Sequence, residues 1–196
     1  MRTVLAVLLT AALASTALAG GNPEVRAYIT FDQGDYVHRL DIAGSQPVTC
    51  YLMMDCLVGG TTGMSFYITL TPEMHTPGFE GYTKPSGWLE LPYGSGSFWS
   101  AEGITFVTGS AGCITDEPVL VATITMFASG TPGDITISDH TIYTREVTDC
   151  NEPALVDAYC VLSHGAINKD PVADEECPCG TPVEESSWGS IKALYR

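Results

Sequence analysis

Hydrophobic and polar residues alternate along most of this chain, with the period of two that is typical of half-buried β-strands. In the first such segment Val25, Ala27 and Ile29 share one face, while Arg26 and Tyr28 lie opposite. A longer segment repeats the pattern, and its predicted inward residues are Val48, Cys50, Leu52, Met54 and Cys56. The predicted strands cover residues 25–31, 36–42, 47–57, 64–70, 103–108, 118–128, 134–138 and 141–147.

No segment of this region has apolar residues at the spacing of an amphipathic helix. Nearly every gap between the predicted strands contains Gly, Pro, Asn or Asp, which favour turns. Many short strands without helices predict an all-β fold, an antiparallel β-sandwich of the immunoglobulin type, over residues 20–148.

The first nineteen residues have the features of a signal peptide. Arg2 is followed by an apolar stretch from Val4 to Ala14, and Ala17-Leu18-Ala19 is a small-x-small cleavage site. We therefore expect Sec-type export, cleavage after Ala19, and a secreted or cell-surface protein. No other stretch has the roughly 20 apolar residues of a membrane-spanning helix, so no membrane span is expected in the mature chain.

The chain is strongly acidic, with 23 acidic and 8 basic residues and a formal net charge of −15. Such a charge repels nucleic acids and anionic lipid headgroups. The expected partners are therefore an extracellular protein or a glycan.

Seven cysteines follow the predicted cleavage site. Export makes disulfides the expected state of these cysteines, and the odd number leaves one thiol free or paired between chains. The spacing of Cys177-Pro-Cys179 is too tight for a zinc site. Residues 149–181 lack a strong strand pattern and are predicted to be a disulfide-rich extension. The candidate cysteines, whose pairing the spacing does not decide, are Cys50, Cys56, Cys113, Cys150, Cys160, Cys177 and Cys179.

Residues 182–196 form a separate C-terminal tail with apolar side chains at helical spacing, which predicts a short helix. The tail resembles the recurring C-terminus of many uncharacterised secreted bacterial proteins. That resemblance implies a sorting signal recognised by export or surface-attachment machinery; the alternative is a tail that docks on the protein's own body. The residues that carry the resemblance are Trp188, Gly189, Lys192, Tyr195 and Arg196.

The sequence contains none of the common catalytic motifs. The Gly-x-Ser-x-Gly elbow, the His-Glu-x-x-His helix and the P-loop are absent, and the four histidines are scattered. We expect a protein that is not an enzyme and has no cofactor, with a small secreted hydrolase as one alternative. Calcium is the ion kept open, through oxygen ligands at Asp32, Asp35, Ser138 and Asp139.

Residues 78–100 interleave aromatic residues with Gly and Ser, and they are the candidate binding segment. Sugar rings stack on exposed Trp and Tyr side chains, which would make this chain a carbohydrate-binding module. The alternative is that these rings close the end of the sandwich as core residues. The candidate ligand-binding residues are Tyr82, Trp88, Tyr93 and Trp99.

Three segments resemble cohesin-type and related carbohydrate-binding β-sandwiches. The strand 64–70 is followed by Thr71-Pro-Glu-Met74, similar to the strand and corner of that family, although Glu73 departs from its pattern. Residues 118–127 and 130–137 resemble the long penultimate strand and the turn and strand after it. The resemblance implies a cohesin-like fold, and we expect a role in extracellular adhesion, structure or assembly.

Overall fold

The computed structural model describes residues 21–74, 81–92, 104–107, 112–139, 145–173 and 177. These residues form thirteen strands and a single 3-10 turn, η1 (Pro72–Met74). The predicted signal peptide 1–19 and the predicted C-terminal tail 182–196 lie outside the described residues. In the part of the chain that is described, no helix is long and apolar enough to cross a membrane.

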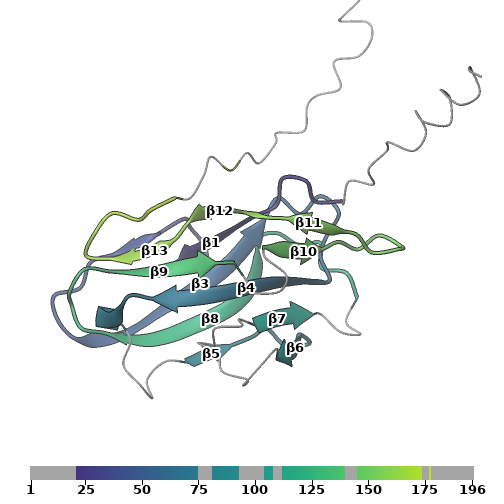
Figure 1. Cartoon of the computed structure of the whole chain (residues 1–196). Helices are drawn as coiled ribbons and strands as arrows, with labels where there is room; N and C mark the ends of the chain where they lie inside the picture. The colour runs from purple at the N-terminus through teal and green to yellow at the C-terminus, as the bar shows by residue number, and fades with distance from the viewer. Residues whose placement is uncertain are drawn as a thin grey trace, which may run out of the picture.

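The strands form two sheets (Figure 1). The first has five strands in the order β12 (Cys160–Ser163), β1 (Arg26–Thr30), β3 (Gln46–Asp55), β8 (Val119–Ala128) and β5 (Gly81–Thr83). The second has eight, and six of them run in the order β11 (Val156–Ala158), β10 (Glu146–Thr148), β4 (Gly63–Leu70), β9 (Gly133–Ser138), β13 (Gly165–Ile167) and β2 (Arg39–Leu40). The other two, β7 (Ile104–Val107) and β6 (Leu89–Pro92), extend from β4.

One core cluster takes side chains from both sheets. In β3 the predicted inward face is confirmed for Val48, Cys50, Leu52 and Met54, which are all buried in this cluster. Cys56 was also predicted to lie on this face, but it follows the end of β3 and is not part of the cluster. The second sheet contributes Met64, Phe66 and Ile68 from β4 and Ile135 and Ile137 from β9. Burying one side chain of this size stabilises the folded state by about 1.5–3 kcal/mol. The buried residues of β3, β4 and β9 therefore supply much of the stability of the fold.

The predicted strand at residues 36–42 is wrong for most of its length, because only Arg39–Leu40 is a strand. The cause is the buried hydroxyl of Thr30 at the end of β1. It donates to the Asp35 carbonyl at 2.7 Å and accepts from the Val37 N–H at 3.0 Å. These bonds turn the chain back over β1 instead of letting it extend.

The sheets are mixed, so the purely antiparallel prediction is corrected. β12 pairs with β1 in parallel, with Arg26 opposite Cys160, and β13 pairs with β2 in parallel, with Ala166 opposite Arg39. Strands β12 and β13 both come from residues 149–181, where the sequence showed no strong strand pattern and a disulfide-rich extension was expected. This segment instead contributes β11, β12 and β13 to the two sheets. These strands have only three or four residues, too few for alternation to be recognised.

The disulfides confirm part of the cysteine prediction. Cys113 bonds to Cys150 and Cys160 bonds to Cys177, and Cys56 is also disulfide-bonded. Among the described cysteines Cys50 is the free one, and it is fully buried in β3. Burial raises the pKa of its thiol, which keeps it protonated and unreactive. Cys179 lies outside the described residues.

Candidate functional site: a tyrosine cluster on the five-stranded sheet

Alternation in β3 and β8 gives the five-stranded sheet a second face, directed away from the core. Thr49 pairs with Thr125, and Tyr51 pairs with Thr123. We call this surface the outer face; its residues are Pro47, Thr49, Tyr51, Leu120, Thr123, Thr125 and Phe127. Thr49 and Thr125 are exposed at its centre, and none of the seven side chains carries a charge although the chain is strongly acidic.

The loop after β1 folds back beside the outer face and is held by short-range hydrogen bonds. The Asp32 carboxylate accepts from the Gly34 N–H at 2.9 Å, and the Asp35 carboxylate accepts from the Tyr36 N–H at 2.7 Å. These are ordinary turn contacts of Asp side chains. Both carboxylates therefore help to hold the conformation of this loop.

Three aromatic rings gather where this loop crosses β1, and we call them the tyrosine cluster: Tyr28, Tyr36 and His38. The ring centroids of Tyr28 and Tyr36 are 4.9 Å apart, and His38 meets the Tyr28 ring edge-on at 5.8 Å. The His38 Nδ1–H donates to the Ile29 carbonyl at 2.5 Å, which fixes the tautomer of the imidazole. Tyr28 is buried, whereas Tyr36 is 49% exposed.

An ion pair holds the exposed ring in place. The Arg26 guanidinium donates two bonds to the Asp55 carboxylate, at 2.5 and 3.0 Å, and the Tyr36 hydroxyl donates to the same carboxylate at 2.6 Å. This hydrogen bond, with some burial, raises the pKa of Tyr36. The bidentate geometry is the strong form of such a pair. Tyr36 therefore presents a ring to solvent that is already immobilised.

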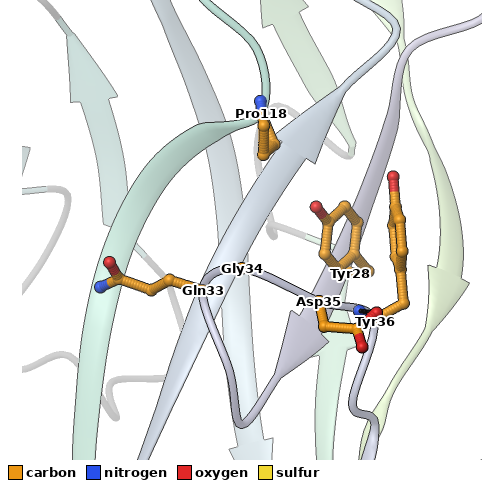
Figure 2. Close-up of a pocket in the computed structure, with 6 residues that line it drawn as sticks. All are labelled: Tyr28, Gln33, Gly34, Asp35, Tyr36 and Pro118. Atoms are coloured by element: carbon orange, nitrogen blue, oxygen red, sulfur yellow. Dashed lines mark hydrogen bonds between the residues drawn. The ribbon is translucent and has the colours of Figure 1, made fainter.

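A hollow of about 150 Å³ opens beside the tyrosine cluster. Figure 2 shows Tyr28 and Tyr36 next to each other, Pro118 across from them, and Gln33 extending to the other side. Gly34 and Asp35 complete its lining. The exposed Gln33 amide makes no hydrogen bond to the chain in the described structure. The hollow thus combines aromatic carbon, a carboxylate and an amide with both donor and acceptor capacity.

Two of the aromatic residues singled out from the sequence, Tyr82 and Trp88, do not line this hollow. Trp88 is 5% exposed and belongs to the core, so its ring offers no stacking face; this matches the alternative weighed for it. Tyr82 is partly buried against the same core. Tyr93 and Trp99 lie outside the described residues. The sequence did place Tyr28 opposite the core, but only the back-folded loop brings Tyr36 beside it.

Other candidate chemistry is engaged in structural contacts. The Asp139 carboxylate accepts from the Arg145 Nε–H at 2.6 Å, and the buried His164 Nδ1 accepts from the Ile137 N–H at 3.1 Å. In the described ranges no three His, Cys, Asp or Glu side chains come together as a metal-binding group. Calcium binding remains an untested prediction.

No protein-family model and no curated protein matches the chain. Similar solved structures include the seventh ScaB type I cohesin from Pseudobacteroides cellulosolvens, 12% identical with a TM-score of 0.48, over 78% of this chain and 96% of that one. A type II cohesin domain from the cellulosome of Acetivibrio cellulolyticus is 14% identical with a TM-score of 0.46, over 74% and 96%. These similarities confirm the cohesin-like pattern of strands that the sequence indicated. Because the sequence identities are so low, the similarity concerns the fold alone.

Proposed function

We propose that this protein is a secreted or cell-surface, non-catalytic module of extracellular adhesion or assembly, and that it binds its partner through the outer face and the tyrosine cluster. The observation that carries the proposal is the half-exposed residue Tyr36, whose hydroxyl is held by Asp55 next to an uncharged sheet face. Disulfides such as Cys113–Cys150 support an oxidising, extracellular compartment.

The charge distribution supports the same surface. A chain with a net charge of −15 repels most acidic partners and its own copies over most of its surface. The outer face avoids that repulsion because Tyr51, Phe127 and their neighbours are uncharged and partly exposed. Tyr side chains give large, rigid contact area with little loss of conformational entropy, which suits a recognition surface.

The proposal predicts that a charge at the centre of the outer face abolishes association. Thr49→Arg places a cation on an exposed position of β3, so the fold should tolerate it. We expect retention on the surface of producing cells to fall about tenfold or more, because an unpaired charge buried in an interface costs over 1.4 kcal/mol. Retention is measured with fluorescently labelled purified protein, and self-association by sedimentation velocity.

Val58→Arg is the matched control, since Val58 is 90% exposed in the loop between β3 and β4, away from the outer face. It introduces the same charge and should leave retention unchanged. A folded Thr49→Arg protein that is retained as well as the wild type would contradict the proposal.

The C-terminal tail adds a second element to this proposal, the sorting signal expected from its sequence. Deleting residues 182–196 should leave the melting temperature unchanged and remove the protein from the cell surface. A deletion protein that is destabilised but correctly located would instead support docking of the tail on the body.

A further inference from the structure

Resting on the proposed function, we infer the chemical class of the ligand: a neutral polysaccharide, one sugar unit of which occupies the hollow beside Tyr36 while the chain continues over the outer face. Three features of the described residues support this class of ligand. They are the immobilised ring of Tyr36, the hydrogen-bonding groups of Gln33 and Asp35 around the hollow, and the lack of charged side chains on the outer face.

The ring supplies the apolar contact. A sugar ring has a face of C–H groups that packs on an aromatic side chain, and a rigid ring loses little entropy when it is covered. Tyr36 is 49% exposed, yet its hydroxyl is fixed to Asp55 at 2.6 Å and its main-chain N–H to Asp35 at 2.7 Å. The ring is therefore preorganised for such a contact.

The hollow supplies the polar contacts. Its volume of about 150 Å³ suits a single sugar unit. Sugar hydroxyls both donate and accept, so they match either the Gln33 amide or the Asp35 carboxylate, which lie on different sides of the hollow. The Gln33 amide has no partner in the described chain, and the Asp35 carboxylate is exposed and uses Oδ1 for the Tyr36 N–H. The Gln33 amide and the Asp35 carboxylate can therefore form hydrogen bonds with a neutral hydroxyl group, and the ligand needs no charge of its own.

The lack of charged side chains on the outer face favours a neutral ligand. The nearest charged pair, Arg26 and Asp55, is closed on itself by two hydrogen bonds, so it offers no net charge to an ionic ligand. Beyond it, Tyr51, Thr49 and Thr125 present a ring and hydroxyls. An anionic polysaccharide would also meet the long-range repulsion of an acidic chain.

The test is affinity electrophoresis of the full-length mature protein in native gels containing hydroxyethylcellulose, xyloglucan, galactomannan or, as the anionic contrast, polygalacturonate. We expect retardation by at least one neutral polymer and none by polygalacturonate. Tyr36→Ala should weaken the neutral interaction about tenfold, since it removes the stacking ring. Gln33→Ala should weaken it by a smaller factor.

Val58→Ala is the control, because Val58 belongs neither to the hollow nor to the outer face, and this variant should bind like the wild type. Circular dichroism melting establishes that each variant is folded. No retardation by any neutral polymer, or equal retardation of wild type and a folded Tyr36→Ala, overturns the inference. If Thr49→Arg still removes cell retention or self-association in that case, the proposed function stands and the partner is a protein or a second copy.

Discussion

Two regions of this molecule are rich in polar side chains, and they use them in opposite ways. One is the N-terminal clasp, which we define as Gly21, Asn22, Gly60 and Asp149 with the Cys113–Cys150 disulfide. The other is the tyrosine cluster with its hollow. In the clasp Asn22 and Asp149 are fully buried, whereas Gln33, Asp35 and Tyr36 around the hollow are exposed.

The polar side chains of the clasp form their hydrogen bonds with other groups of the same chain. The Asp149 carboxylate accepts from the N–H groups of Gly21 at 2.8 Å, Leu155 at 2.7 Å and Asn151 at 3.1 Å. The Asn22 side chain donates to the Gly60 carbonyl at 2.6 Å and accepts from the Gly59 N–H at 2.8 Å. Buried polar groups need such partners, because an unmatched one costs about 1–3 kcal/mol.

The hollow keeps hydrogen-bonding capacity for something outside the chain. The Gln33 amide has no partner in the described structure, and Tyr36 is 49% exposed. Polar side chains thus have two roles in this molecule, and the sequence does not distinguish them. Where every polar group is hydrogen-bonded within the chain, as in the clasp, the polar side chains stabilise the fold. Where some groups on a rigid support lack a partner, as around the hollow, they leave a surface able to bind.

The largest expected effect is at Gly60 in the clasp. Its φ of +64° disfavours a side chain, and a Cβ would lie 2.5 Å from the Cys113 sulfur. Gly60→Ala should lower the unfolding free energy by about 3 kcal/mol and the melting temperature by roughly 10 °C, without changing ligand binding. Scanning calorimetry measures it. Gly44→Ala, where nothing lies within 4 Å, is the control and should be nearly neutral; similar melting points for the two variants would refute a tightly packed clasp.

A smaller effect, dependent on pH, is expected at Asp149. Burial alone would raise its pKa, but the hydrogen bonds from Leu155, Gly21 and Asn151 outweigh burial and lower it. A lowered folded pKa gives stability that is present above the unfolded pKa of about 4 and is lost as the pH falls through the folded pKa. Asp149→Asn should cost about 2 kcal/mol at pH 7, and the gap to the wild type should narrow below pH 4.

Thermal melts between pH 2.5 and 7 measure this gap. Asp170→Asn is the control, because Asp170 is 91% exposed and makes only a surface ion pair with Arg39. Its expected effect is below about 0.5 kcal/mol at any pH. A gap between wild type and Asp149→Asn that is constant with pH would contradict the role given to the ionised carboxylate.

The smallest effect is expected in the tyrosine cluster, where Tyr36→Phe removes one hydrogen bond to Asp55. We expect a loss of about 1 kcal/mol at neutral pH. Because the folded pKa of Tyr36 is raised above about 10, its contribution is complete below pH 10 and is lost as the pH rises through the folded value.

Ultraviolet titration near 295 nm, as the difference between wild type and Tyr36→Phe, reports this ionisation. Tyr51→Phe is the matched control, since the Tyr51 hydroxyl makes no hydrogen bond in the described structure. Its removal should leave stability unchanged. Tyr36 ionising below pH 10 would show that the bond to Asp55 does not hold in solution.

Much of the strand pattern was predictable from the sequence. The strands 47–57, 64–70, 118–128 and 134–138 were predicted within two residues of β3, β4, β8 and β9, because hydrophobic residues alternate along them and turn residues flank them. The candidate site was not predictable to the same degree. Trp88, one of the four aromatic residues predicted to bind a ligand, is in the core, and Tyr36 reaches its position through a turn that interrupts the predicted strand.

The sequence by itself determined the features that repeat locally: alternation, turn residues, the acidic charge and the supply of cysteines. Only the tertiary structure decided which segments meet. The parallel pairing of β12 with β1, the bond between Cys113 and Cys150, and the contact of Tyr36 with Asp55 join residues that local patterns do not connect. Such contacts depend on the shape of the assembled sheets, since a strand of four residues carries too little periodic information to specify its neighbour.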